Sequence, residues 1–209
     1  MSRRRKSDEL TPRNTSQKDL LVGLQNFQLT FAIGPAGTGK TYVSVTHACE
    51  LLKAEEIKKI VVTRPMVEAE EHIGFLPGDA NEKFAPYFAP IREIMDQHFP
   101  NVDQMVKNKQ IEIAPFAFMR GRTFNDAFVL LDEAQNTTPK QMKLFLTRLG
   151  DYARVCVSGD LDQVDIEGPS GLLDAIERHQ NIPEVKIVEF DESDIVRSKL
   201  VKKIIANYR

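Results

Sequence analysis

The chain has 209 residues, of which 42% are hydrophobic and 28% are charged, and it contains no tryptophan. This composition excludes a fibrous or intrinsically disordered protein, and the length accommodates one substantial α/β domain. The net charge of −2 excludes a strong overall attraction to nucleic acid, so any contact with RNA or DNA has to be local.

The chain starts with a polar, basic stretch over residues 1–16. No apolar run follows it, as a signal peptide would require, and no later run approaches the length of a membrane span. Cys49 and Cys156 lie in apolar surroundings without metal spacing, which is typical of buried, reduced thiols. We therefore expect a cytoplasmic protein without membrane contact. It has a flexible tail, either solvated or tethering RNA, and one ordered domain over residues 17–209.

Six short apolar runs predict strands, and helical patterns separate them. The predicted strands cover residues 29–33, 59–63, 110–114, 128–131, 154–158 and 186–190. Most of these runs are almost continuously apolar, as strands are when helices cover both faces of a sheet. The alternation of strands and helices predicts an α/β fold in which helices sandwich a mainly parallel sheet.

One predicted helix is marked at both ends. Thr138, Pro139 and Gln141 form the pattern of a capping box with proline in the first turn. Gly150 is placed to end this helix after residue 149.

The stretch 64–100 differs from the rest, because prolines recur through it between aromatic residues. We predict a long excursion with short helices, one of them over residues 91–99. Excursions of this length in a compact domain usually carry function.

Residues 34–41, GPAGTGKT, match the pattern GxxxxGK[ST] of a phosphate-binding loop in full. The run follows a predicted strand and precedes a helical pattern, which is the expected context; a glycine-rich turn without ligand is the alternative. Backbone amides at Gly37 and Gly39 can face phosphate oxygens, Lys40 neutralises the β- and γ-phosphates, and the Thr41 hydroxyl ligates Mg²⁺. The predicted ATP-binding residues are Gly34, Pro35, Ala36, Gly37, Thr38, Gly39, Lys40 and Thr41.

The predicted strand 128–131 ends in two acids, Asp132 and Glu133. We expect this strand to lie beside the strand of the phosphate-binding loop, where Asp132 holds Mg²⁺ through water and Glu133 polarises the attacking water. Two acids that only cap a strand are the alternative. Residues 132–135, DEAQ, also resemble the DExx box of superfamily 1 and 2 helicases, which points to hydrolysis rather than transfer to a small acceptor.

Residues 158–163, SGDLDQ, follow another strand at its carboxyl end, where α/β sheets place ligands. Gln163 is a candidate γ-phosphate sensor or water positioner with a role in catalysis, and Asp160 can support the magnesium ligands. A polar turn is the alternative.

Arginines near the predicted ligand edge are candidates for phosphate contacts: Arg64, Arg120, Arg122 and Arg197. Guanidinium groups suit the phosphates of ATP or of a nucleic-acid backbone, and Arg197 can serve as a transition-state arginine. Ordinary ion pairing, or a surface charge in the case of Arg197, is the alternative. Nearby aromatic side chains can stack on bases or pack in the core: Phe84, Tyr87, Phe116 and Phe118.

These runs together resemble the PhoH family, the phosphate-starvation-inducible ATPases of bacteria and phages. The resemblance extends from residue 17 to residue 208 and rests on residues 33–41, 64–69, 74–79, 118–124, 131–138, 141–150 and 158–165. It is far more specific than a phosphate-binding loop alone. Two positions depart from the family's pattern, since Glu70 replaces a glycine and Ser198 replaces a histidine.

The resemblance implies a RecA-like core of the superfamily 1 helicase type that hydrolyses ATP with Mg²⁺ and is linked to RNA metabolism. It also implies that Gln17 lies near adenine, and that residues 170–172 and Arg197 belong to the later motifs. The two departures concern the geometry around residues 68–74 and the residue after Arg197, and they leave the phosphate site untouched.

Superfamily 1 helicases close their nucleotide between two RecA-like domains, whereas 209 residues hold one. We therefore expect a homo-oligomeric ring such as a hexamer, in which one subunit offers Arg120 or Arg122 to its neighbour's ATP. We predict an ATPase that acts with RNA or single-stranded nucleic acid. An ATP-dependent switch that remodels a protein partner is the alternative, and the position of Glu133 disfavours a small-molecule kinase.

Overall fold

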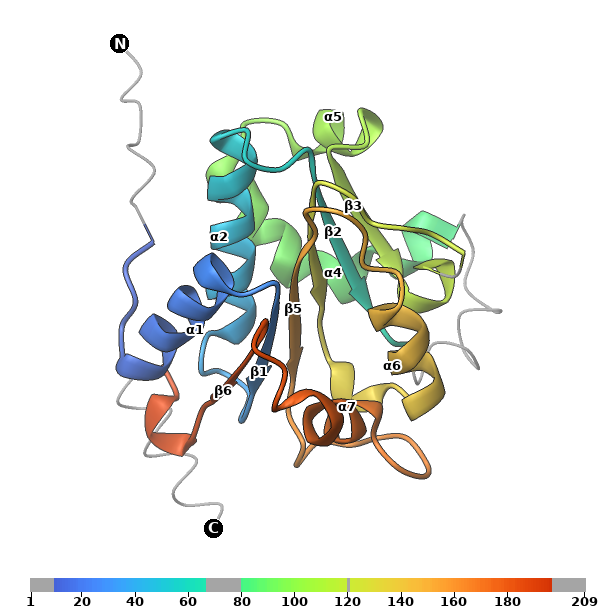
Figure 1. Cartoon of the computed structure of the whole chain (residues 1–209). Coiled ribbons are helices and arrows are strands. Elements are labelled where there is room, and N and C mark those ends of the chain that lie inside the picture. The colour runs from blue at the N-terminus through green and yellow to red at the C-terminus, as the bar shows by residue number, and fades with distance from the viewer. Residues whose placement is uncertain (1–9, 67–79, 120, 197–209) are drawn as a thin grey trace.

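Within the described residues, which are 10–66, 80–119 and 121–196 of the computed structural model, six parallel strands form one central sheet (Figure 1). Their order is β3-β2-β4-β5-β1-β6. The strands are β1 (Leu29–Ile33), β2 (Lys59–Arg64), β3 (Ile111–Pro115), β4 (Ala127–Leu131), β5 (Arg154–Gly159) and β6 (Val185–Glu189). Each strand starts and ends within one residue of its predicted bounds, so the predicted parallel sheet is confirmed.

Helices cover both faces of the sheet (Figure 1). They are α1 (Thr15–Asn26), α2 (Lys40–Lys53), α4 (Ala80–His98), α5 (Val102–Lys107), α6 (Pro139–Leu146) and α7 (Gly171–His179). Three short 3₁₀ turns in the described ranges are η2 (Phe116–Met119), η3 (Ala134–Asn136) and η4 (Glu192–Asp194). None of the helices in these ranges has the length and apolar composition that a bilayer crossing requires.

Side chains of the sheet alternate between two hydrophobic cores. On β2, Ile60 and Val62 belong to the core under α1, α2 and α4, whereas Val61 belongs to the core under α6 and α7. Because every strand of the centre is apolar on both faces, the sheet is buried between the helical layers and leaves its carboxyl edge for polar residues.

The strand order corrects one prediction. The sequence predicts that the strand before Asp132 lies beside the strand before the phosphate-binding loop, but β5 lies between β4 and β1. Leu131 of β4 is opposite Val157 of β5, and Ile33 of β1 is opposite Gly159. The interior residues of β5 are fully buried, so this strand requires a neighbour on each side. The acids therefore face the phosphate-binding loop across the end of β5.

The excursion after β2 also differs from the prediction. Residues 67–79 lie outside the described residues, but residues 80–98 form one helix of 19 residues, α4, rather than a short helix over 91–99. Pro86 and Pro90 lie inside it four residues apart, so the N–H missing at Pro90 is the one that would bond to the carbonyl of Pro86. Burial of Phe88, Ile91 and Met95 in the core offsets the cost of the prolines.

The helix α6 starts as predicted, because Thr138 and Gln141 form both hydrogen bonds of a capping box. It ends at Leu146, however, and not at residue 149. The backbone N–H of Phe124 donates to the carbonyl of Arg148 at 3.0 Å, and the N–H of Gly150 donates to the carbonyl of Phe124 at 2.9 Å. This pairing draws residues 148–150 out of the helix. Gly150 permits this approach rather than capping the helix, since a Cβ atom there would lie 2.8 Å from that carbonyl oxygen.

Candidate functional site

The phosphate-binding loop connects β1 to α2 at the carboxyl edge of the sheet. Gly34, Gly37 and Gly39 have φ angles of 135°, 82° and 92°, which other residues rarely adopt. A side chain at Gly34 is excluded for a second reason, because its Cβ atom would lie 2.2 Å from the carbonyl oxygen of Phe190. The helix α2 begins directly after the loop at Lys40, so its positive end faces any anion that the loop holds.

Gln17 of α1 lies buried beneath this loop, with 4% of its surface exposed. Its Nε2 atom donates to the carbonyl of Thr38 at 2.9 Å, and its Oε1 atom accepts from the N–H of Arg13 at 2.9 Å. Both ends of the amide thus bond to the protein backbone, and Gln17 does not line the pocket that the loop borders. The contact with adenine stays a prediction.

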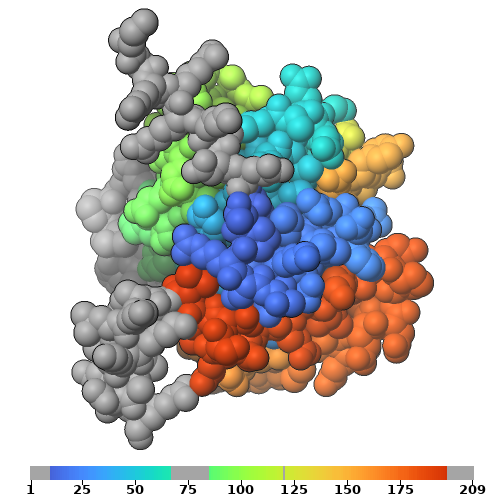
Figure 2. All heavy atoms as spheres, turned by 90° about the vertical axis from the view of Figure 1, so that its left-hand side faces the viewer, coloured from blue at the N-terminus to red at the C-terminus, as the bar shows by residue number. Residues whose placement is uncertain are grey.

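Residues 190–196 hold the loop from another side. The N–H of Val196 donates to the carbonyl of Gly37 at 2.9 Å, next to the contact between Gly34 and Phe190. Figure 2 shows this segment (red) lying against α1 (blue), and the Asn14 amide donates to the carbonyl of Asp194 at 3.2 Å. Two segments that are far apart in the sequence are therefore joined to each other beside the loop.

Lys40 folds back onto the loop. Its Nζ atom donates to the carbonyls of Gly34 at 2.5 Å and Pro35 at 2.8 Å, and 8% of the residue is exposed. Burial lowers the pKa of this ammonium group, and the charges of Asp160 and Asp132 partly oppose that shift. No carboxylate in the described residues contacts the Nζ atom directly, so a phosphate group would supply the missing counter-charge.

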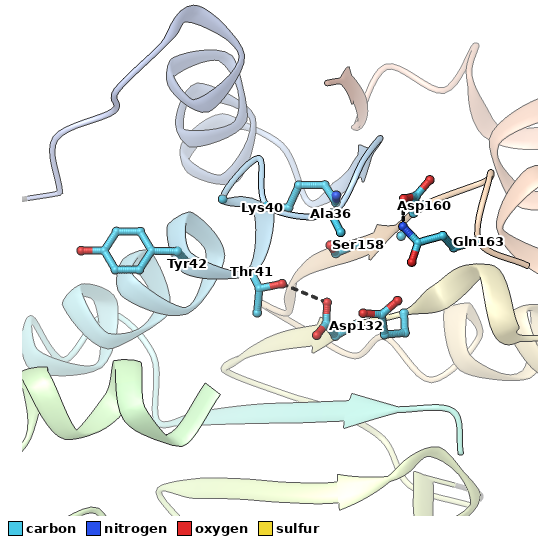
Figure 3. Close-up of a pocket in the computed structure, with 12 residues that line it drawn as sticks. Ala36, Lys40, Thr41, Tyr42, Asp132, Ser158, Asp160 and Gln163 are labelled. Atoms are coloured by element: carbon cyan, nitrogen blue, oxygen red, sulfur yellow. Dashed lines mark hydrogen bonds between the residues drawn. The ribbon is translucent and has the colours of Figure 1, made fainter. Parts of the chain in front are cut away.

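Asp132, at the end of β4, bonds both to Thr41 after the loop and to Arg64 at the end of β2. Its side chain is 3% exposed. The Oδ1 atom accepts from the Thr41 hydroxyl at 3.1 Å (Figure 3), and the Oδ2 atom accepts from Nη2 of Arg64 at 2.9 Å. The Nη1 atom of Arg64 donates to the carbonyl of Tyr87 on α4 at 3.0 Å. The Thr41 hydroxyl and the Asp132 carboxylate are oxygen ligands of the kind that Mg²⁺ prefers, so this pair fits that ion.

Glu133 adopts a left-handed backbone conformation with φ 53° and ψ 39°. Its Oε1 atom accepts from Nη2 of Arg64 at 3.3 Å, and its Oε2 atom accepts from Nε2 of Gln135 at 2.7 Å. Both carboxylate oxygens thus have a donor, although the side chain stays 42% exposed. The carboxylate is held at the rim of the pocket, where solvent water can reach it.

The end of β5 supplies the third side of the site. Asp160 is 6% exposed, and its Oδ2 atom accepts from Nε2 of Gln163 at 2.6 Å (Figure 3). Its Oδ1 atom accepts from the N–H of Asp162 at 3.1 Å, so the turn after the strand is fixed by this one carboxylate. Gln163 is therefore held at the pocket by Asp160.

These elements enclose a pocket of about 240 Å³ (Figure 3). Its lining residues are Ala36, Gly37, Gly39, Lys40, Thr41, Tyr42, Asp132, Glu133, Ser158, Gly159, Asp160 and Gln163. The pocket has the Lys40 ammonium group and backbone amides on the side of the loop, and carboxylates on the side of β4 and β5. Such a distribution can accept a polyphosphate with its metal ion.

The predicted arginine Arg122 does not line this pocket. Arg122 forms an ion pair with Glu112 on β3 and lies over the ring of Phe124 at 5.6 Å. This is the ordinary ion pair of the alternative interpretation, whereas Arg64 reaches the site through its ion pairs with Asp132 and Glu133. Arg120 and Arg197 lie outside the described residues.

The predicted aromatic residues have different surroundings. Phe116 is buried and packs against Phe145 with 5.9 Å between ring centroids. Phe118 is 55% exposed in η2, which follows β3, and Tyr87 is half-buried against the core under α4. The side chain of Phe84 lies outside the described part of the chain. Of these residues, Phe118 has the exposure that stacking on a base requires.

The sequence analysis does not identify two residues of the site. Tyr42 follows Thr41 directly, lines the pocket and is 43% exposed. Gln135 is 1% exposed, and its side chain joins Glu133 to the backbone of Asp160. The position of Gln135 in the run 132–135 indicates that it lies near the site. A sequence pattern does not show, however, which groups its side-chain amide will bond to.

Comparison with protein families and with curated sequences gives one consistent result. The model of the family described as PhoH-like protein matches residues 9–209. A PhoH-like protein of Bacillus subtilis is 45% identical over 207 residues, which cover 97% of this chain and 65% of that protein. Protein PhoH of Escherichia coli K12 is 45% identical over 210 residues, which cover 98% of this chain and 59% of that protein. The chain thus spans about three-fifths of the length of these curated relatives.

Comparison with solved structures concerns the fold. The large terminase of a thermophilic bacteriophage, solved in complex with ADP, has a TM-score of 0.58 at 13% identity. The match covers 93% of this chain and 50% of that chain. The UvsW helicase of bacteriophage T4 has a TM-score of 0.54 at 12% identity, covering 88% of this chain and 61% of that chain. The predicted RecA-like fold, a parallel sheet between helical layers, is therefore confirmed.

Proposed function

Because the chain belongs to the family of PhoH-like proteins, we propose that it binds Mg·ATP in the pocket between the phosphate-binding loop and β4, and hydrolyses it there. One observation carries this proposal: Lys40, Thr41, Asp132, Glu133 and Gln163 line a single pocket although they come from three parts of the sequence. The relatives share the family, and the terminase and the helicase share the fold, which supports a nucleotide as the ligand.

Each side of the pocket has a separate task in binding. Backbone amides of residues 34–39 and the Lys40 ammonium group hold the β- and γ-phosphates, and Lys40 exchanges its loop carbonyls for phosphate oxygens. Thr41 and Asp132 would hold Mg²⁺, which would neutralise charge on the same phosphates. Arg64 holds the Asp132 carboxylate in place before the nucleotide enters.

Hydrolysis requires a water molecule in line with the γ-phosphate. Its oxygen forms a bond to phosphorus while the bond from phosphorus to the bridging oxygen of ADP breaks. Glu133 polarises this water and accepts its proton, and Gln163 orients it or senses the γ-phosphate. The exposure of Glu133 supports this assignment, because its carboxylate reaches the solvent side of the pocket.

We further propose that the ATPase is cytoplasmic and acts on RNA or single-stranded nucleic acid in a helicase-like manner. The exposed ring of Phe118 in η2 supports a contact with bases, and the helicase among the structural neighbours supports the analogy. A homo-oligomeric ring, in which Arg120, Arg122 or Arg197 reaches a neighbour's ATP, remains part of this proposal. Light scattering during ATP turnover tests it, and a strictly monomeric species would exclude the ring.

An ATPase assay with and without RNA, DNA and phosphate acceptors tests the function. We expect phosphate release that RNA stimulates and that Lys40→Ala abolishes. Hydrolysis without any response to polymers would favour the alternative, a switch that remodels a protein partner. A phosphorylated acceptor would indicate a kinase, and a wild-type protein that neither binds nor hydrolyses ATP would refute the proposal.

A further inference from the structure

Gln135 occupies a buried position between the two acidic sides of the pocket. It lies in η3, and 1% of its surface is exposed. Its Nε2 atom donates to Oε2 of Glu133 at 2.7 Å, and its Oε1 atom accepts from the N–H of Asp160 at 3.1 Å. One amide thus links the acid after β4 to the turn after β5.

The chemistry of the partners fixes the orientation of this amide. The backbone N–H of Asp160 can only donate, so the oxygen of Gln135 has to face it. The NH₂ group then faces the carboxylate of Glu133, which is an acceptor. A rotated amide would place two donors together and two acceptors together in a buried site, so a single orientation is stable.

The backbone of Gln135 is fixed as well. The Ser170 hydroxyl, at the start of α7, donates to the carbonyl of Gln135 at 2.9 Å. A Cβ atom at Gly159 would lie 2.7 Å from Oε1 of Gln135, so glycine is required there for the side chain to pass. Gln135 is therefore a fixed hydrogen-bond donor that supports the carboxylate of Glu133.

Three hydrogen bonds in series extend from this support across the pocket. They run from Glu133 to Gln135, from Gln135 to Asp160, and from Asp160 to Gln163 at 2.6 Å. The other hydrogen bond to Glu133 comes from Nη2 of Arg64 and is longer, at 3.3 Å. The same Nη2 atom also donates to Asp132. The shorter and more buried contact is the one that determines where the Glu133 carboxylate lies.

We propose that Gln135 is a positioning residue of the ATPase reaction: it aims the Glu133 carboxylate and makes its orientation depend on the turn that carries Gln163. A change at Gln163 when the γ-phosphate is present or absent is then transmitted to Glu133 through Asp160 and Gln135. This inference rests on the proposed function, since it concerns the same hydrolysis.

Single-turnover hydrolysis of ATP by the full chain tests the inference. The variants are Gln135→Met, which keeps the side-chain length but removes both hydrogen bonds, and the same change in a Glu133→Gln protein. Gln180→Met on the protein surface is the matched control, and Lys40→Ala reports on the proposed function itself. Melting temperature and the affinity for a fluorescent ATP analogue are measured for each variant.

We expect Gln135→Met to lower the single-turnover rate constant roughly ten- to hundredfold, with the affinity for ATP changed less than about threefold. In the Glu133→Gln protein the same change should alter the rate less than about threefold, because the group that Gln135 positions is gone. A wild-type rate in Gln135→Met, or an equal loss in both backgrounds, would overturn the inference while the proposed function stands. A wild-type protein that hydrolyses no ATP would remove both.

Discussion

His47 permits a quantitative test of the packing between α2 and the sheet. It lies on α2 with 4% of its surface exposed, and its ring meets that of Phe128 edge to face, with 6.1 Å between centroids. The ring forms a hydrogen bond with the backbone of Leu24, but its Nε2 atom is buried without a partner in the described part of the chain. Burial lowers the pKa of His47 from 6.5 to about 4, and the charge of Arg154 adds to this effect.

The sign of the effect on stability follows from this shift. The folded protein binds the proton more weakly, so the unfolded chain takes up more protons between pH 6.5 and about pH 4. The free energy of unfolding is therefore unaffected by His47 above pH 6.5 and decreases as the pH falls through this window. The full loss is about 3 kcal/mol, of which about 2 kcal/mol is lost by pH 5.

Urea unfolding of the wild type and of His47→Asn at pH 7 and pH 5 measures this contribution. Asparagine can still bond to Leu24 but does not titrate. The variant is less stable at pH 7 because it leaves a cavity, but its loss between pH 7 and pH 5 should be smaller by about 2 kcal/mol. An equal loss in both proteins would refute the reasoning, because carboxylates that titrate in the same range affect both alike.

Three further substitutions test the site and its support. Lys40→Ala should weaken ATP binding at least roughly tenfold in calorimetry, since the ammonium group makes charge-assisted hydrogen bonds; an unchanged affinity would contradict its role. Arg64→Met should let Mg²⁺ alone raise the melting temperature by about 3 °C, because Asp132 loses its guanidinium partner; an equal rise in the wild type would argue against this. Thr138→Ala should cost about 1 kcal/mol of stability through the lost cap of α6, whereas Thr147→Ala, beyond the end of that helix, should cost less than about 0.5 kcal/mol; equal costs would exclude a capping effect.

The sequence predicts those parts of this protein that depend on local chemistry. The run 34–41 needs glycines, a lysine and a hydroxyl at fixed spacing, and the strands are short apolar runs between helical patterns, so both are predictable. The position of β5 between β1 and β4 is not, because strand order depends on how each crossover packs against the whole sheet.

Contacts between remote side chains were missed for the same reason. Arg64 meets Asp132 because Thr63 of β2 lies opposite Leu131 of β4, and this register comes from the packing of the sheet. The bond between Gln135 and the backbone of Asp160 joins residues that are 25 positions apart. A sequence pattern can show that an arginine or a glutamine is near a motif, but only the fold shows which of several acids it meets.

The attachment of α1 and of residues 190–196 to the phosphate-binding loop has a mechanical consequence. The loop is not an isolated turn on a rigid sheet, since Gln17 holds Thr38 from one side and Val196 holds Gly37 from another. A displacement of the loop by an entering nucleotide would therefore act on these two segments as well as on β1 and α2, which the loop connects. A fluorophore or a neighbouring domain attached to either segment would therefore respond to phosphate binding in the loop. A force applied to either segment would in turn change the conformation of the loop.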